Sequence, residues 1–225
     1  MAKFLLPIAV CFFLSLANVQ GLQTVNGRIK ITVGTTSGCG DTVRFVADLV
    51  EAYGLYRDFL DIEFVPWGRT LRNTDGSLTC QFGVNDCWAN RLHRCVLNKL
   101  QGNLDAQMHY MNCEFTTPFP SYLQGSYICA HAVGLNLVDV DYCVANPNDE
   151  LDFEAERIGS ALTQAINFIP SIVFNDNIDQ DLHTQSLSSA RILDGFTHGV
   201  LNVVINVFLI RNSFNFCVFI SLTTE

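Results

Sequence analysis

The fold is decided by residues 28–53, which read RIKITVGTTSGCGDTVRFVADLVEAY. Residues 28–33 alternate and are rich in β-branched side chains, as is typical of a β-strand. A turn of small residues follows, and the apolar side chains of residues 41–53 then recur at helical spacing. Residues 60–67, LDIEFVPW, predict a second strand. A strand, a helix and a strand in so short a stretch predict a βαβ unit, whose two strands are parallel and joined by a right-handed crossover.

The composition predicts a globular protein with an acidic surface. Hydrophobic residues make up 49% of the 225-residue chain and charged residues only 16%, which excludes a disordered chain. The formal net charge is -9. Because nucleic acids and anionic lipids attract basic proteins, we expect no nucleic-acid partner and no membrane association.

Residues 1–21 have the features of a secretory signal peptide. Lys3 precedes an apolar run over residues 4–16, and small or short side chains follow up to a plausible cleavage site after Gly21. We therefore expect the mature chain to reach an oxidising compartment, where cysteines are usually structural disulfides. The sequence has no CxxC motif and no pair of histidines at ligand spacing, so we expect no metal site.

An insertion, residues 69–148, interrupts the α/β pattern of a domain that we assign to residues 22–198. It holds six of the cysteines, and residues 84–100 within it predict a helix among shorter helices and loops. The α/β pattern then returns, with a helix at 152–165, a strand at 171–175, a turn at 176–178 that could lead into a short strand, and a helix at 183–196.

Residues 199–225 form an atypical hydrophobic tail. Two very apolar stretches, 200–210 and 214–222, flank Arg211. An arginine at the centre of a membrane helix costs about 2.5–3.5 kcal/mol on insertion scales, which argues against a membrane span. A buried pair of strands and an end that is not native to the protein are the alternatives.

Cys39 is the most informative single residue. It follows a predicted strand, lies between glycines, and stands at the start of a predicted helix. The amino end of a helix carries a partial positive charge and unpaired N–H groups, which stabilise the thiolate that acts in disulfide exchange. Position alone allows two interpretations, a nucleophile or a structural cysteine.

A second motif favours the interpretation of Cys39 as a nucleophile. Residues 80–95 read CQFGVNDCWANRLHRC, which is very similar to the signature of the gamma-interferon-inducible lysosomal thiol reductase family. That signature is CQHG, two residues, EC, two residues, N, four residues and C, and every spacing is kept. Phe82 replaces the family histidine and Asp86 the family glutamate. Residues 65–68, VPWG, resemble the family segment VPYG, and the resemblance extends from about residue 29 to residue 196.

The resemblance implies an α/β, thioredoxin-like fold with a cysteine-rich, mainly helical insertion. It implies a thiol-disulfide oxidoreductase that reduces disulfides of proteins or peptides. Cys39 matches the attacking cysteine of the family, and Thr42 stands where the family has the resolving cysteine. We expect Thr42 to donate a hydrogen bond to the Cys39 thiolate. We expect Ile169 and Pro170 to form a cis-proline loop that contacts the substrate.

The missing second thiol decides the mechanism that we expect. Because Thr42 cannot attack a mixed disulfide, an external small thiol must release the product, and no other cofactor is implied. The alternative is a catalytically weak or inactive family member that acts as an extracellular binding or host-defence protein.

The other cysteines are predicted to be structural. Cys87 and Cys95 lie about 12 Å apart along one predicted helix. This exceeds the limit of about 7 Å between the Cα atoms of a disulfide, so the two cannot pair. Cys80 is the short-range partner for Cys87. Cys95 would then pair with one of the three remaining cysteines of the insertion, which are Cys113, Cys129 and Cys143. The two cysteines that Cys95 leaves could pair with each other. Cys217 would stay free.

The resemblance implies a secreted or endosomal–lysosomal protein. The sequence contains no Asn-x-Ser/Thr sequon, so N-linked glycosylation is not expected. Because lysosomal sorting by mannose phosphate uses such glycans, secretion is favoured over lysosomal delivery.

Overall fold

The computed structural model describes residues 27–191. The predicted signal peptide, the tail over residues 199–225 and Cys217 lie outside the described residues. Within them, no helix is both long enough and apolar enough to cross a membrane.

The predicted βαβ unit is confirmed. Strand β1 (Ile29–Thr35) is followed by helix α1 (Gly40–Tyr56), a single 3₁₀ turn and strand β2 (Leu60–Pro66). The two strands are parallel, and their register pairs Ile31 with Ile62. Six of the seven residues of β1 are buried, with Ile29, Ile31 and Val33 on one face; a slip by one residue would turn these three to the opposite face, so burial fixes the register.

A third strand completes the sheet of the described residues. Strand β5 (Ser171–Phe174) runs antiparallel to β1, so the strand order is β2-β1-β5. The further short strand predicted after residues 176–178 is absent there, and only an isolated bridge joins Phe174 to Asn177. Asn175 and Asp176 both have positive φ angles and turn the chain sharply, which leaves no extended segment to pair.

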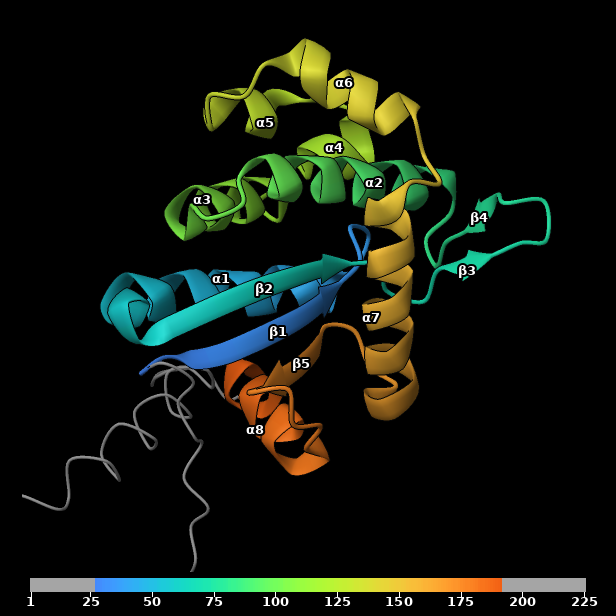
Figure 1. Ribbon diagram of the computed structural model, residues 1–225. Coiled ribbons are helices and arrows are strands. Elements are labelled where there is room, and N and C mark those ends of the chain that lie inside the picture. The colour runs from blue at the N-terminus through green and yellow to red at the C-terminus, as the bar shows by residue number, and fades with distance from the viewer. Residues whose placement is uncertain (1–26, 192–225) are drawn as a thin grey trace, which may run out of the picture.

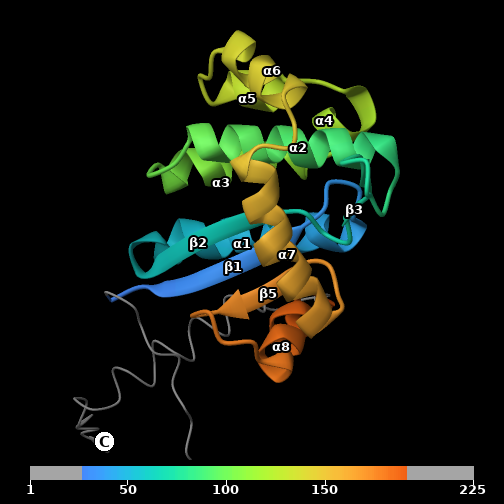
Figure 2. The ribbon, with the colours of Figure 1, turned by 45° about the vertical axis from the view of Figure 1, so that its right-hand side comes forward.

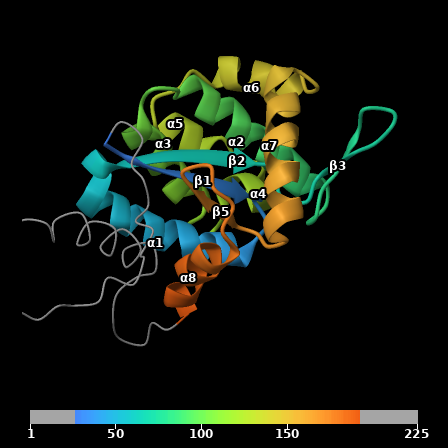
Figure 3. The ribbon, with the colours of Figure 1, turned by 60° about the horizontal axis from the view of Figure 1, so that its bottom comes forward.

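Helices cover both faces of the sheet (Figures 1 and 3). Helix α1 and helix α8 (Gln180–Arg191) pack together on one face, and helix α7 (Glu150–Ile166) lies on the other. The α1 face buries a continuous core: Ile31, Val33, Phe45, Leu49, Ile62, Ile172 and Phe174. The α7 face buries a smaller cluster: Val65, Trp67, Leu162, Ile166 and Val173. This arrangement is a thioredoxin-like fold, as predicted.

The insertion forms a separate helical layer beside the sheet (Figure 2). It begins with a hairpin that the sequence did not predict and continues with the predicted long helix and four shorter ones. In chain order these are β3 (Leu71–Arg72), β4 (Leu78–Thr79), α2 (Val84–Lys99), α3 (Leu104–Glu114), α4 (Pro120–Gln124), α5 (Ile128–Ala132) and α6 (Leu137–Ala145). The hairpin projects away from the body of the molecule (Figure 1).

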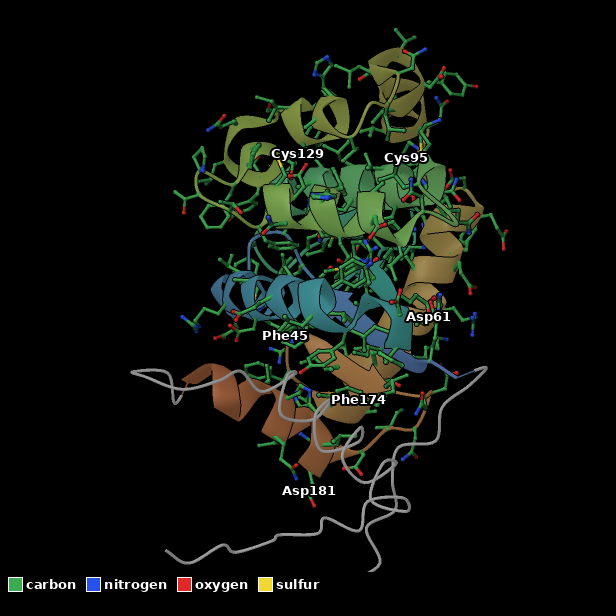
Figure 4. All side chains as sticks on the ribbon, turned by 90° about the vertical axis from the view of Figure 1, so that its left-hand side faces the viewer. Phe45, Asp61, Cys95, Cys129, Phe174 and Asp181 are labelled. Carbon is green, nitrogen blue, oxygen red and sulfur yellow. A yellow bond between two sulfur atoms is a disulfide. The ribbon has the colours of Figure 1, made fainter. Side chains whose placement is uncertain are left out.

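Three disulfides hold the insertion. They join Cys80 to Cys87, Cys95 to Cys143 and Cys113 to Cys129. Figure 4 shows Cys95 and Cys129 in the helical layer, apart from Phe45 and Phe174 in the layer of the sheet and α1. The Cys95–Cys143 bond spans 48 residues. In the chain-entropy model, a loop of this length stabilises the fold by about 4 kcal/mol.

A buried ionic network fastens the insertion to α7. Arg91 and Arg94 of α2 both bind the fully buried carboxyl group of Asp152, at 3.0 and 2.8 Å. Arg91 also binds Asp149, the N-cap residue of α7. Burial lowers the pKa of Arg94 to about 10, although attraction to Asp152 opposes the shift. Because burying one partner alone would be costly, these side chains lock α2 and α7 in one arrangement.

A second buried polar cluster joins α2, α3 and α4. Nε2 of His93 lies 3.1 Å from the Ser121 hydroxyl and 3.5 Å from a Glu114 carboxyl oxygen. The backbone N–H of Ser121 donates to Glu114 at 3.2 Å. Burial raises the pKa of Glu114, but the hydrogen bonds from His93 and Ser121 outweigh burial and leave this pKa below its usual value.

Acid should therefore destabilise the insertion through Glu114. Because the pKa of Glu114 is lower in the folded state, its stabilising effect is complete above the unfolded-state value of about 4.3. That effect is lost as the pH falls through the folded-state pKa. We expect Glu114→Gln to reduce the slope of unfolding free energy against pH below about pH 4.3 by up to about 1.4 kcal/mol per pH unit. Urea unfolding at a series of pH values measures this slope. Glu150→Gln, at an exposed position of α7, is the control, and equal slopes in both variants would contradict the prediction.

Candidate active site at the start of helix α1

Cys39 is the N-cap residue of α1, directly after the turn that leaves β1. Its backbone is extended, and its carbonyl accepts the first helical hydrogen bond from the N–H of Val43 at 3.3 Å. The side chain is 7% exposed, and Cys39 is the free cysteine of the described residues. The Cys39 side chain makes no capping hydrogen bond, and the thiol stands at the amino end of α1, where a helix carries a partial positive charge.

The loop before β5 contacts Cys39, although it lies far from Cys39 in the sequence. The Ile169–Pro170 peptide bond is cis. The Cys39 thiol donates to the carbonyl of Ile169 at 3.5 Å, across 130 residues of sequence. Ile169 and Pro170 are therefore direct neighbours of the thiol, and the substrate role of these two residues remains a prediction.

Arg69 ties this loop to the end of β2. Its guanidinium donates to the backbone carbonyl of Asn167 at 2.8 Å and to the Asn167 side chain at 3.3 Å. Asn167 ends α7 in the left-handed conformation, two residues before Ile169. No local pattern indicates this contact, because its partners lie 98 residues apart in the chain.

Thr42 does not make the expected hydrogen bond to Cys39. Its side chain is fully buried, and its hydroxyl oxygen has no hydrogen-bond partner. The physical reason is that Thr42 lies on the face of α1 that packs into the protein, whereas the Cys39 sulfur contacts the Ile169 carbonyl. The prediction that Thr42 holds the thiolate by a hydrogen bond is thus wrong for this structure.

Asp86 organises the turn that presents Cys39, and sequence reasoning gave it no role. This fully buried residue is the third residue of α2. Its carboxyl group accepts hydrogen bonds from the Thr36 hydroxyl at 2.8 Å, the Ser37 hydroxyl at 2.6 Å and the Gly38 N–H at 3.1 Å. It also accepts the N–H of Phe82 at 3.3 Å. One side chain therefore holds both the residues before Cys39 and the start of α2.

Asn90, one turn further along α2, completes this arrangement. Its side-chain oxygen accepts the Ser37 N–H at 2.9 Å, and its amide donates to the Thr36 hydroxyl at 3.0 Å and to Asp86 at 3.2 Å. Asp86 and Asn90 belong to the signature motif, so this part of the motif acts by fixing the turn before Cys39.

The charged residues nearest to Cys39 in the sequence pair with each other. Asp41 and Arg44, three residues apart on the first turn of α1, form a partly exposed ion pair. Each of these two charges therefore has a partner of opposite sign beside it. No cluster of potential metal ligands occurs among residues 27–191.

Comparison with known proteins shows similarity to one family. The family described as gamma interferon inducible lysosomal thiol reductase matches residues 30–132, which include Cys39, Thr42 and the whole signature motif. GILT-like protein 1 of Drosophila melanogaster is 25% identical over 195 residues, which cover 79% of this chain and 77% of that protein. The gamma-interferon-inducible lysosomal thiol reductase-like protein of Anopheles gambiae is 25% identical over 186 residues, which cover 73% and 74%.

Over residues 30–132, the chain is similar to the gamma-interferon-inducible lysosomal thiol reductase family, and its similarity to the two insect relatives extends over most of its length. A solved structure of a thioredoxin-like oxidoreductase from Silicibacter pomeroyi aligns with a TM-score of 0.48 and 16% identity, covering 74% of this chain and 88% of that one. The similarity to this family supports a thiol oxidoreductase. The three disulfides suit a protein of an oxidising compartment.

The chain has one free thiol at the site where a dithiol enzyme has two. Cys39-Gly40-Asp41-Thr42 keeps the spacing of a CxxC motif, and Thr42 removes the second sulfur. The remaining six cysteines of the described residues are all disulfide-bonded. A chemical cycle at Cys39 therefore cannot close through a second free cysteine of the described residues.

Proposed function

We propose that the protein is a thiol-disulfide oxidoreductase that reduces disulfides of proteins or peptides through Cys39 alone. The observation that carries this proposal is the free Cys39 at the helix terminus, in contact with the carbonyl that precedes Pro170. An extended peptide that replaces the thiol–carbonyl contact would bring its own sulfur next to Cys39.

The cycle uses two molecules of an external small thiol. The Cys39 thiolate attacks one substrate sulfur, which forms a mixed disulfide and expels the other substrate sulfur as a thiolate. A small thiolate then attacks the mixed disulfide and regenerates Cys39, carrying the substrate sulfur away as a second mixed disulfide. A second small thiolate releases that sulfur as a thiol. The substrate disulfide is reduced, and the two small thiols are oxidised to their disulfide.

One observation favours a second candidate, a binding protein without turnover. Thr42 removes the resolving thiol, so a partner captured at Cys39 stays attached until an external thiol arrives. Such a protein would act outside the cell in recognition or host defence, on the same scaffold.

The proposal includes a location and a set of partners. The partners are disulfide-containing proteins or peptides, and the one co-reactant is the small thiol. After cleavage behind Gly21, the protein would be secreted, because it has no sequon for glycan-dependent sorting to lysosomes.

Reduction of insulin with excess small monothiol tests the proposed function. We expect the protein to accelerate reduction at about pH 4.5, about pH 7 or both, and Cys39→Ser to return the rate to that of the thiol alone. Cys39 is nearly buried, so serine fits its place and the variant should fold. Equal background rates for both proteins at both pH values would contradict the reductase and favour the binding protein.

A further inference from the structure

Phe82 forms part of the surface next to Cys39, although the mechanism above assigns it no role. A Cβ atom added to Gly38 would lie 2.7 Å from Cβ and 2.8 Å from Cγ of Phe82. Phe82 therefore packs directly on the residue that precedes Cys39. Its side chain is nevertheless 38% exposed, so it presents an aromatic surface to solvent beside the thiol.

The position of Phe82 is fixed by several contacts. Its N–H and the N–H of Gly38 bind the same Asp86 carboxyl group, at 3.3 and 3.1 Å. The Cys80–Cys87 disulfide closes the short loop that contains it. The backbone of Phe82 is thus held by Asp86 and by the disulfide loop, and its side chain packs on Gly38; a residue placed in this way loses little conformational freedom when a ligand binds.

The exposed side chains next to Phe82 in the sequence carry no charge: Gln81, Val84 and Asn85. Val84, two residues further on, is 81% exposed. Asp41 and Arg44, the charged residues next to Cys39 in sequence, are bound to each other. A peptide that approaches Cys39 along this side meets apolar surface and no unpaired charge from these residues. Covering such surface is favourable for an apolar side chain and unfavourable for a carboxylate.

We propose that Phe82 is a specificity-determining residue that contacts the side chain flanking the substrate cysteine and selects apolar residues there. This inference rests on the proposed function, since it concerns the substrate of Cys39. The substrate class is then a peptide or partly unfolded protein segment in which a leucine or an aromatic residue adjoins the disulfide-bonded cysteine.

Exchange with two short peptides tests this inference without requiring turnover. Each peptide carries one cysteine activated as a thiopyridine disulfide, flanked by leucines in one peptide and by glutamates in the other. We expect wild-type protein to react about tenfold faster with the leucine peptide, equivalent to about 1.4 kcal/mol. We expect Phe82→Ala to bring the two rates within about twofold of each other, and Phe82→Leu to keep most of the preference.

The matched control is Leu123→Ala on α4, which removes another exposed apolar side chain, 59% exposed. It should leave the ratio of the two rates unchanged. Equal rates in wild-type protein, or a preference that survives in Phe82→Ala, would overturn the inference while leaving the reductase intact.

A failure of the proposed function gives a different result. In that case, wild-type protein reacts with neither peptide. Calorimetric titration with the same peptides, carrying serine in place of cysteine, then decides the inference. Tighter binding of the leucine peptide that is lost in Phe82→Ala supports it, and equal binding of both peptides to wild-type protein overturns it.

Discussion

Thr42→Cys should speed the release of a mixed disulfide from Cys39 by more than about 100-fold when no external thiol is present. The introduced thiol would lie at CxxC spacing on the same helical turn, so its attack on the Cys39 sulfur is intramolecular. In the natural protein, the same mixed disulfide persists until a small thiol collides with it.

The position accepts the change. Thr42 is fully buried and its hydroxyl oxygen has no hydrogen-bond partner, so a cysteine side chain would not leave a donor unsatisfied there. We therefore expect the variant to be at least as stable as the natural protein.

Release of thionitrobenzoate measures this effect. The chromophore is first attached to Cys39 as a mixed disulfide, and its departure is then followed by absorbance. Thr42→Ser is the control, because it keeps a hydroxyl and adds no sulfur. Release at the same slow rate from Thr42→Cys and Thr42→Ser would show that the geometry at residue 42 does not allow a dithiol cycle.

Asp86→Ala should lower the free energy of unfolding by about 3 kcal/mol or more. The change deletes one fully buried acceptor and leaves three donors without it, the Thr36 hydroxyl and the N–H groups of Gly38 and Phe82. The Ser37 hydroxyl keeps only its longer bond to the backbone carbonyl of residue 86. Buried groups left unsatisfied cost about 1–3 kcal/mol each, and some of this cost is relieved by relaxation or by water. Urea unfolding measures the loss.

The same variant tests whether Asp86 acts on Cys39 through the turn. In conditions where Asp86→Ala is still folded, we expect the rate of mixed-disulfide formation at Cys39 to fall, with partial recovery in Asp86→Asn, which keeps one acceptor oxygen. Asp139→Ala, at an exposed position in α6, is the control and should change stability by less than about 0.5 kcal/mol. A stability loss of that small size in Asp86→Ala would refute the role of Asp86 as an anchor.

The βαβ unit and the long helix of the insertion could be predicted because their apolar residues recur with a clear period. The alternation of Ile29, Ile31 and Val33 and the helical spacing of α1 are local to each element and visible in the sequence, although β1 is buried on both faces. Strands β3 and β4 have two residues each, which is too short for any period to be visible. Helix α8 begins at Gln180 and not at His183, because Asp179 accepts the N–H of Leu182 before the apolar pattern starts.

The candidate site was predictable only in part, because several of its contacts join residues that are far apart in the sequence. The place of Cys39 between a strand and a helix is a local feature. The bonds of Asp86 to Thr36 and Ser37 cross about fifty residues, and an aspartate in a first helical turn usually lies at the surface. The absence of a hydrogen bond from Thr42 to Cys39 depends on which face of α1 is buried. The spacing of three residues between Cys39 and Thr42 does not determine that face.

The disulfides of the insertion also have a consequence for proteolysis. A protease that cuts the chain between residues 96 and 142 produces two fragments that the Cys95–Cys143 bond still joins. A cut between residues 114 and 128 is bridged a second time, by the Cys113–Cys129 bond. Cys39 and the sheet lie outside this stretch. A cleaved molecule would therefore keep its free Cys39 thiol, and its two fragments would stay covalently joined until the disulfides of the insertion are reduced.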